Sequence, residues 1–209
     1  MSEDRQFHRP ALFDARLADN LPGEGDPADR AAVAHQTAWA LLARARSAAP
    51  SDPALVARLI NLVQSEGIDL LVQLWAPAAP DSLPGALWRL YLLRELVRGD
   101  LTVAARYRLG QSRREVDAVI AGSRDIPGPP EMRDLADSIL SGVFVGEFDI
   151  ALHRAAAFCR IVSVGAALDA DLIDSPHQAN QAIRQSRQLR NMAVDLAKVA
   201  EHWKVGRLV

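Results

Sequence analysis

Asp149 and His153 are the two residues whose types and spacing come closest to a chemical site. Four residues apart on a helix, they share one face, where a carboxylate and an imidazole could both bind a metal ion. A third ligand would have to come from elsewhere, and the chain has no paired Glu-x-x-His motif. We therefore expect no metal here, and expect His153 to be a surface side chain that bonds to Asp149.

The remaining reactive residue types form no catalytic set. Cys159, the single cysteine, lies on an apolar stripe, where a buried structural thiol is expected rather than a nucleophile. The chain has neither a glycine-rich phosphate loop nor a Gly-x-Ser-x-Gly elbow. We expect a protein that is not an enzyme and that uses no cofactor.

Residues 101–120 offer a different chemistry, because their second half resembles the helix-turn-helix signature of DNA-binding regulators. In that motif a glycine takes the left-handed turn position between two helices, and a serine caps the second, recognition helix. Gly110 and Ser112 occupy those places. The candidate nucleic-acid contacts are Arg108, Gln111, Arg113 and Arg114.

The same segment departs from the motif in two ways. Arg106 stands where the motif has a small residue at the contact between its helices. Glu115 and Asp117 would bring negative charge toward the phosphates. The alternative is an ordinary helix corner inside a bundle, with Ser112 as a plain cap.

Arginines are concentrated around this corner. Seven arginines against Glu95 and Asp100 give residues 89–114 a net charge of +5. Such a surface could contact phosphate, an acidic protein or acidic lipid heads, or could simply be solvated. The candidate basic patch consists of Arg89, Arg94 and Arg98.

A short apolar stretch between two glycines is a candidate docking site for a partner protein. It consists of Val143, Phe144 and Val145. One interpretation is an exposed apolar loop that binds a partner. The other is a tight turn between helices that places Phe144 in the core.

The elements that position these residues are all predicted to be helical. Capping residues followed by proline, as in Asp26-Pro27 and Ser175-Pro176, mark helix starts, and glycines such as Gly67 and Gly99 mark ends. No segment shows the alternation of a strand. We predict an all-α bundle of eight or nine helices and no sheet, with helices near 27–48, 51–66, 68–75, 82–99, 100–110, 112–122, 131–140, 147–170 and 175–204.

The last two helices carry matching apolar seams and predict a long antiparallel pair. In the final helix the seam residues alternate in steps of four and three: Ala182, Ser186, Leu189, Ala193, Leu196, Ala200 and Trp203. Because the connection near 170–175 is short, the two helices are expected to pack on each other. The rival use of the final seam is a homodimer.

The domain organisation follows from composition. Residues 1–26 read as a flexible N-terminal arm, 27–122 as an N-terminal helical half, and 123–130 as a linker rich in proline and glycine. Residues 131–209 form a C-terminal helical half packed on the first.

Bulk properties narrow the class of protein. The chain has 209 residues, a net charge of −2 and 49% hydrophobic residues, which is typical of a globular protein. That charge argues mildly against unaided DNA binding. The start of the sequence has no apolar signal region, and no apolar run reaches the length of a membrane span. We expect a cytoplasmic protein that does not bind membranes.

Three stretches together resemble a group of small all-helical proteins of high-GC actinobacteria: residues 86–95, residues 107–110, and residues 136–159. Some members carry a name that connects them to the β subunit of RNA polymerase. The resemblance implies an all-helical fold and, at most, a link to transcription, and it assigns no role to any residue. The sequence thus favours a non-enzymatic interaction or regulatory protein with an unknown protein partner. The alternative is a DNA-binding regulator.

Overall fold

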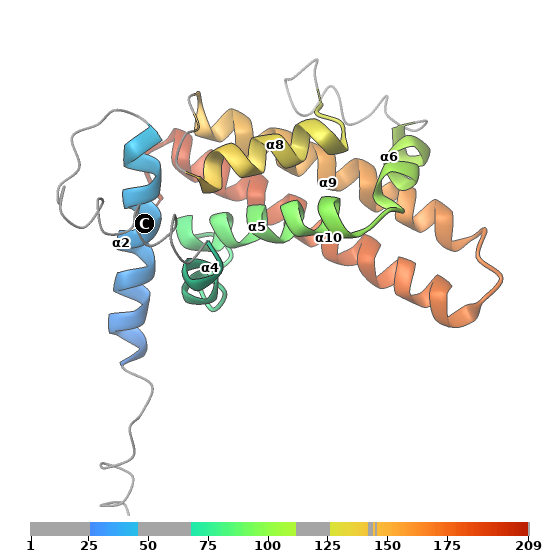
Figure 1. The fold of residues 1–209 in the computed structure, drawn as a ribbon, viewed down its shortest axis with the longest axis horizontal. Helices are drawn as coiled ribbons and strands as arrows, with labels where there is room; N and C mark the ends of the chain where they lie inside the picture. The colour runs from blue at the N-terminus through green and yellow to red at the C-terminus, as the bar shows by residue number, and fades with distance from the viewer. Residues whose placement is uncertain (1–25, 46–67, 112–125, 142–143, 145, 209) are drawn as a thin grey trace, which may run out of the picture.

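The computed structural model describes residues 26–45, 68–111, 126–141, 144 and 146–208 (Figure 1). This part of the chain contains helices and no strand, so the predicted all-α class is confirmed. The helices expected near 51–66 and 112–122, and the N-terminal arm, lie outside the described residues. The described helices are α2 (Pro27–Ala45), α4 (Asp69–Trp75), α5 (Leu83–Gly99), α6 (Val103–Gln111), α8 (Pro129–Leu140), α9 (Phe148–Ala170) and α10 (Pro176–Lys204).

Side-chain caps fix two of the helix starts. The Asp26 carboxylate accepts a hydrogen bond from Ala28 N at 2.9 Å, and the Ser82 hydroxyl accepts one from Gly85 N at 3.2 Å. Each satisfies a backbone donor that the first helical turn leaves without a partner.

The long helices α9 and α10 run antiparallel and side by side (Figure 1). Near their middle, the Ser163 hydroxyl donates to Ser186 O and the Ser186 hydroxyl donates to Ser163 O, both at 2.8 Å. Every residue of the seam on α10 from Ala182 to Ala200 is buried. The predicted helix pair is therefore confirmed.

The other helices pack around one half of this pair. Figure 1 shows α5 and α8 side by side along it, α6 at the far end of α5, and α2 crossing the opposite end steeply. Trp75 joins α4 to α2, since its indole N–H donates to the Thr37 hydroxyl at 3.0 Å. The end of the α9–α10 hairpin near residues 165–180 extends beyond α5 and α8.

One hydrophobic core joins the two predicted halves. Leu87 and Leu93 of α5 belong to the same buried cluster as Leu152 and Phe158 of α9. The stacked rings of Tyr107 and Phe158, 5.3 Å apart, connect α6 to α9 in that cluster.

Helix α9 is long and apolar enough to cross a membrane by length and composition alone. However, 67% of its most apolar window is buried inside the fold, as in the central helix of a globular bundle. Ser163, at 4% exposed, is hydrogen-bonded within that helix pair.

Candidate functional site

Gly110 does not occupy a turn. It lies inside α6, which continues to Gln111, and its φ is not among the positive values found in the described residues, at Gly146 and Gly206. A Cβ on Gly110 would lie 1.9 Å from the carbonyl oxygen of Ile161 on α9. The prediction of a left-handed turn at Gly110 is therefore wrong: the glycine allows two helix backbones to touch.

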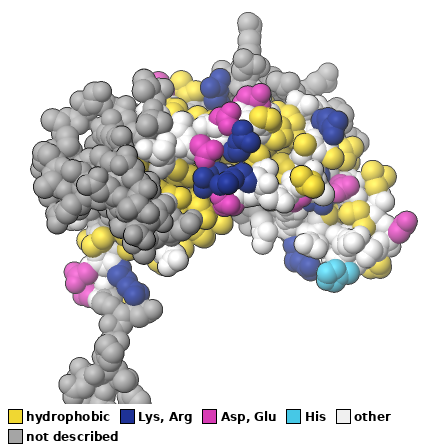
Figure 2. Space-filling model, viewed as in Figure 1, with side chains coloured by type: hydrophobic (Ala, Val, Ile, Leu, Met, Phe, Trp, Pro, Cys, Tyr) yellow, Lys and Arg dark blue, Asp and Glu magenta, His cyan; other side chains and the backbone are white. Residues whose placement is uncertain are grey.

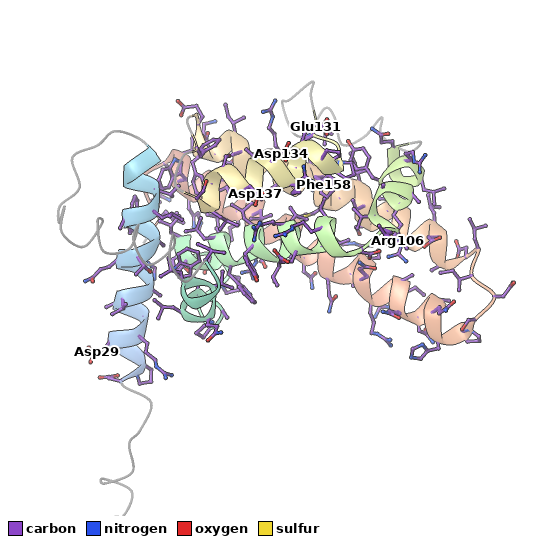
Figure 3. All side chains as sticks on the ribbon, viewed as in Figure 1. Asp29, Arg106, Glu131, Asp134, Asp137 and Phe158 are labelled. Carbon is purple, nitrogen blue, oxygen red and sulfur yellow. The ribbon has the colours of Figure 1, made fainter. Side chains whose placement is uncertain are left out.

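Arg106 is buried in the same crossing, with 8% of its surface exposed (Figure 3). Its guanidinium bonds to the Asp169 carboxylate at 2.9 Å and also donates to the Gln185 side chain. Asp100 lies 3.8 Å from it. This network ties α6 to both α9 and α10, so Arg106 holds these three helices together.

Burial alone would raise the pKa of Asp100. Hydrogen bonds from Thr102 and Gln185, together with the positive charge of Arg106, instead hold this pKa below its ordinary value of 3.8. Asp100 thus remains ionised within the network at neutral pH.

Two of the four candidate nucleic-acid contacts, Arg108 and Gln111, are among the described residues. Arg108 is exposed on α6, and its side chain donates to Ala104 O at 3.3 Å. Gln111 is half-buried at the end of α6. Arg113 and Arg114 lie outside the described residues. The described half of the corner therefore lacks the turn on which the helix-turn-helix interpretation depends.

The candidate basic patch is largely neutralised by two acids from distant parts of the chain and by the neighbouring Glu95. Arg89 binds the Asp195 carboxylate through two nitrogens, at 2.8 and 3.0 Å, and Arg94 binds Asp137 of α8. Arg98 lies 3.5 Å from Glu95. Figure 2 shows basic and acidic side chains interleaved on this face, and Figure 3 places Asp137 on α8. The patch joins elements rather than presenting free positive charge.

Of the three residues of the candidate docking loop, Phe144 is among the described residues. Phe144 is half-buried and packs against the core, and Gly146 beside it has a φ of +153°. That backbone conformation favours glycine, as a tight turn between helices requires. Val143 and Val145 lie outside the described residues.

The candidate reactive residues have structural environments. The side chain of His153 forms a hydrogen bond with Glu201 of α10 at 3.1 Å. The prediction that it bonds to Asp149 is therefore wrong. Cys159 is buried, and desolvation raises its pKa to about 12. Among the described residues, no group of three or more His, Cys, Asp or Glu side chains could hold a metal ion.

An apolar groove on the α9–α10 hairpin is a feature that sequence reasoning missed. It has a volume of about 750 Å³, and most of its lining surface is apolar. Its principal lining residues are Arg160, Val164, Leu168 and Asp171 of α9, with Ile183 and Arg190 of α10. Ile183 is 39% exposed, so part of its side chain remains in contact with solvent in the groove.

Charge along this groove is polarised. Because Ser163 of α9 lies opposite Ser186 of α10, Arg160 and Arg190 fall at the same end. Asp171 lies at the other end, eleven residues and about 16 Å along α9. Among the described residues, Arg160 and Arg190 have no ion pair, unlike Arg89 and Arg94.

A sequence signal for this groove does exist. Ile183 and Arg190 lie seven residues apart, so they share the face of α10 beside its buried seam. No family model, curated protein or solved structure matches the chain, so the fold and the groove are the observations that bear on function.

Proposed function

We propose that this protein is a non-enzymatic interaction protein that acts through the α9–α10 groove, and that a second copy of the chain occupies it. The observation that carries the proposal is the polarised groove: an apolar centre with two arginines at one end and an aspartate at the other. Helices commonly dock into such grooves through their apolar faces.

The apolar centre provides the driving force for association. Val164 and Leu168 are half-buried and Ile183 is exposed, so all three can lose further solvent contact. Elsewhere on the same hairpin, Leu172 is 73% exposed and Val194 is 59% exposed. Packing two hairpins face to face would remove this apolar surface from water, at about 25 cal/mol per Å².

The charges favour a second copy over an unrelated partner. A twofold axis through the groove would run the two hairpins in opposite directions. Arg160 and Arg190 of one copy would then meet Asp171 of the other, twice per interface. Such self-complementarity is what an isologous dimer requires.

Sedimentation velocity over a wide range of concentration tests the proposal. The wild-type chain is expected to associate reversibly into a dimer. Leu168→Glu and Ile183→Glu each place an unpaired charge in the apolar centre, and are expected to weaken the dimer by about tenfold or more.

Ile150→Glu is the matched control. Ile150 is also an exposed isoleucine, at 49%, and lies on the same helix α9, but outside the groove. This variant is expected to dimerise like the wild type. A wild-type chain that stays monomeric at all concentrations, or groove variants that dimerise as the control does, would overturn the proposal.

Three further expectations from the sequence belong to this proposal. They are a cytoplasmic location, a link to transcription implied by the family resemblance, and the absence of a catalytic role. The neutralised arginines of α5 make protein binding a better-supported function than DNA binding.

A further inference from the structure

Arg154 of α9 is a half-buried cation with no counter-ion among the described residues. Its side chain is half-buried, and its Nε is fully buried with no hydrogen-bond partner. In the part of the chain that the structure describes, Arg154 forms no ion pair. An unpaired, partly buried guanidinium costs free energy, so an anion that binds its accessible part would recover some of that cost.

Arg154 lines a separate pocket of about 630 Å³, a volume typical of small-molecule sites. The pocket lies between α6, α8 and α9, away from the groove of the α9–α10 hairpin. Gln111 of α6 adds an amide, and Ile126 and Leu135 add apolar surface. Tyr107 forms part of the wall, held by its hydrogen bond to Ile126 O at 3.3 Å.

We propose that this pocket binds a small organic monocarboxylate. The ligand's carboxylate would accept hydrogen bonds from the Arg154 guanidinium, which presents several donors in a planar fork. Its apolar body would lie against Ile126 and Leu135.

Glu131 sets the charge that the pocket accepts. This residue lies in the first turn of α8, lines the pocket and is exposed (Figure 3). Its carboxylate lies close enough to Gly128 that an added Cβ there would be 2.8 Å from its Oε2. Because the Glu131 carboxylate repels a doubly charged anion more than a singly charged one, we expect a monocarboxylate to bind better than inorganic phosphate.

Calorimetric titration of the full-length chain with phenylacetate tests the proposal. Phenylacetamide, which has the same shape and no charge, and inorganic phosphate serve as comparison ligands. Saturable binding is expected for phenylacetate alone. Arg154→Met should weaken it by about tenfold or more, because charge-assisted hydrogen bonds are lost, and Arg154→Lys should weaken it less.

Arg160→Met is the matched control, since Arg160 is also half-buried and unpaired on α9 but lies in the other cavity. It should bind phenylacetate like the wild type. Thermal unfolding adds a second readout: without ligand, Arg154→Met should have a Tm equal to or above that of the wild type.

Three results would each overturn the assignment. They are the absence of saturable phenylacetate binding, binding that Arg154→Met leaves unchanged, and phosphate binding as tight as that of phenylacetate. A lowered Tm for Arg154→Met would also count against it, because it would show that the chain itself satisfies the Arg154 charge.

Discussion

Gly110 of α6 and Gly165 of α9 face each other's helices across one crossing. A Cβ on Gly110 would lie 1.9 Å from Ile161 O, and a Cβ on Gly165 would lie 1.7 Å from Arg106 O. The two contacts are four residues apart on both helices, so they form consecutive turns of the same close approach. On α9, the ion pair between Arg106 and Asp169 extends this contact by one further helical turn.

This crossing predicts that alanine is poorly tolerated at either glycine. Gly110→Ala and Gly165→Ala should each lower the free energy of unfolding by about 3 kcal/mol or more, because the Cβ meets backbone that cannot rotate away. Gly99→Ala is the control, since nothing lies within 4 Å of a Cβ there. Urea denaturation measures all three, and equal stabilities at positions 99 and 110 would contradict the close approach.

Asp100 should make stability depend on pH. Its pKa is depressed in the folded chain, so its contribution is present above the unfolded value of 3.8 and is lost as pH falls through the folded value. Asp100→Asn is expected to cost about 1 kcal/mol at pH 7, since it removes charged hydrogen bonds at a partly exposed site. The difference from wild type should shrink below about pH 4. Urea unfolding across pH measures it, and a constant difference would show that the charge of Asp100 is irrelevant.

Cys159 should be unreactive in the folded protein. Burial raises its pKa to about 12, so almost no thiolate exists at pH 8. Labelling with a thiol-specific chromogenic disulfide should be slow in buffer and complete in denaturant. Rapid stoichiometric labelling of the native chain would show that α9 opens readily around this residue.

The paired arginines predict weak affinity for nucleic acid. Arg89, Arg94 and Arg106 already bind carboxylates, so these three guanidinium groups of α5 and α6 are not free to replace counterions on DNA. In fluorescence anisotropy, random duplex DNA should not bind at about 50 mM salt, and Arg108→Ala should change nothing. Tight binding that weakens steeply with salt and with Arg113→Ala/Arg114→Ala would restore the helix-turn-helix interpretation.

Local pattern sufficed to predict part of this structure. The seam of α10 repeats in steps of four and three, and its burial against α9 follows from that period. The Asp26 cap marks the start of α2 through a hydrogen bond to a residue only two positions away. These features depend on near neighbours in the chain.

The misassigned features depend on distant partners. A glycine in a turn and a glycine at a close helix crossing look the same in the sequence. For Gly110, the difference depends on α9, a distant helix that carries Gly165 at the same crossing. Likewise, Arg89 forms an ion pair with Asp195, 106 residues away. The net charge of residues 89–114 does not include this acid, so it could not predict that Arg89 is neutralised. The groove emerges only when α9 and α10 are paired, since each helix supplies one wall.

Mixing two charge variants tests the self-complementary groove most directly. Arg160→Glu/Arg190→Glu makes both ends of the groove acidic, and Asp171→Arg makes both ends basic. Each variant alone should be monomeric in sedimentation velocity, because like charges would meet at both ends of its dimer. An equimolar mixture should form a one-to-one dimer. A mixture that stays monomeric while the wild type dimerises, or variants that each dimerise like the wild type, would contradict this account.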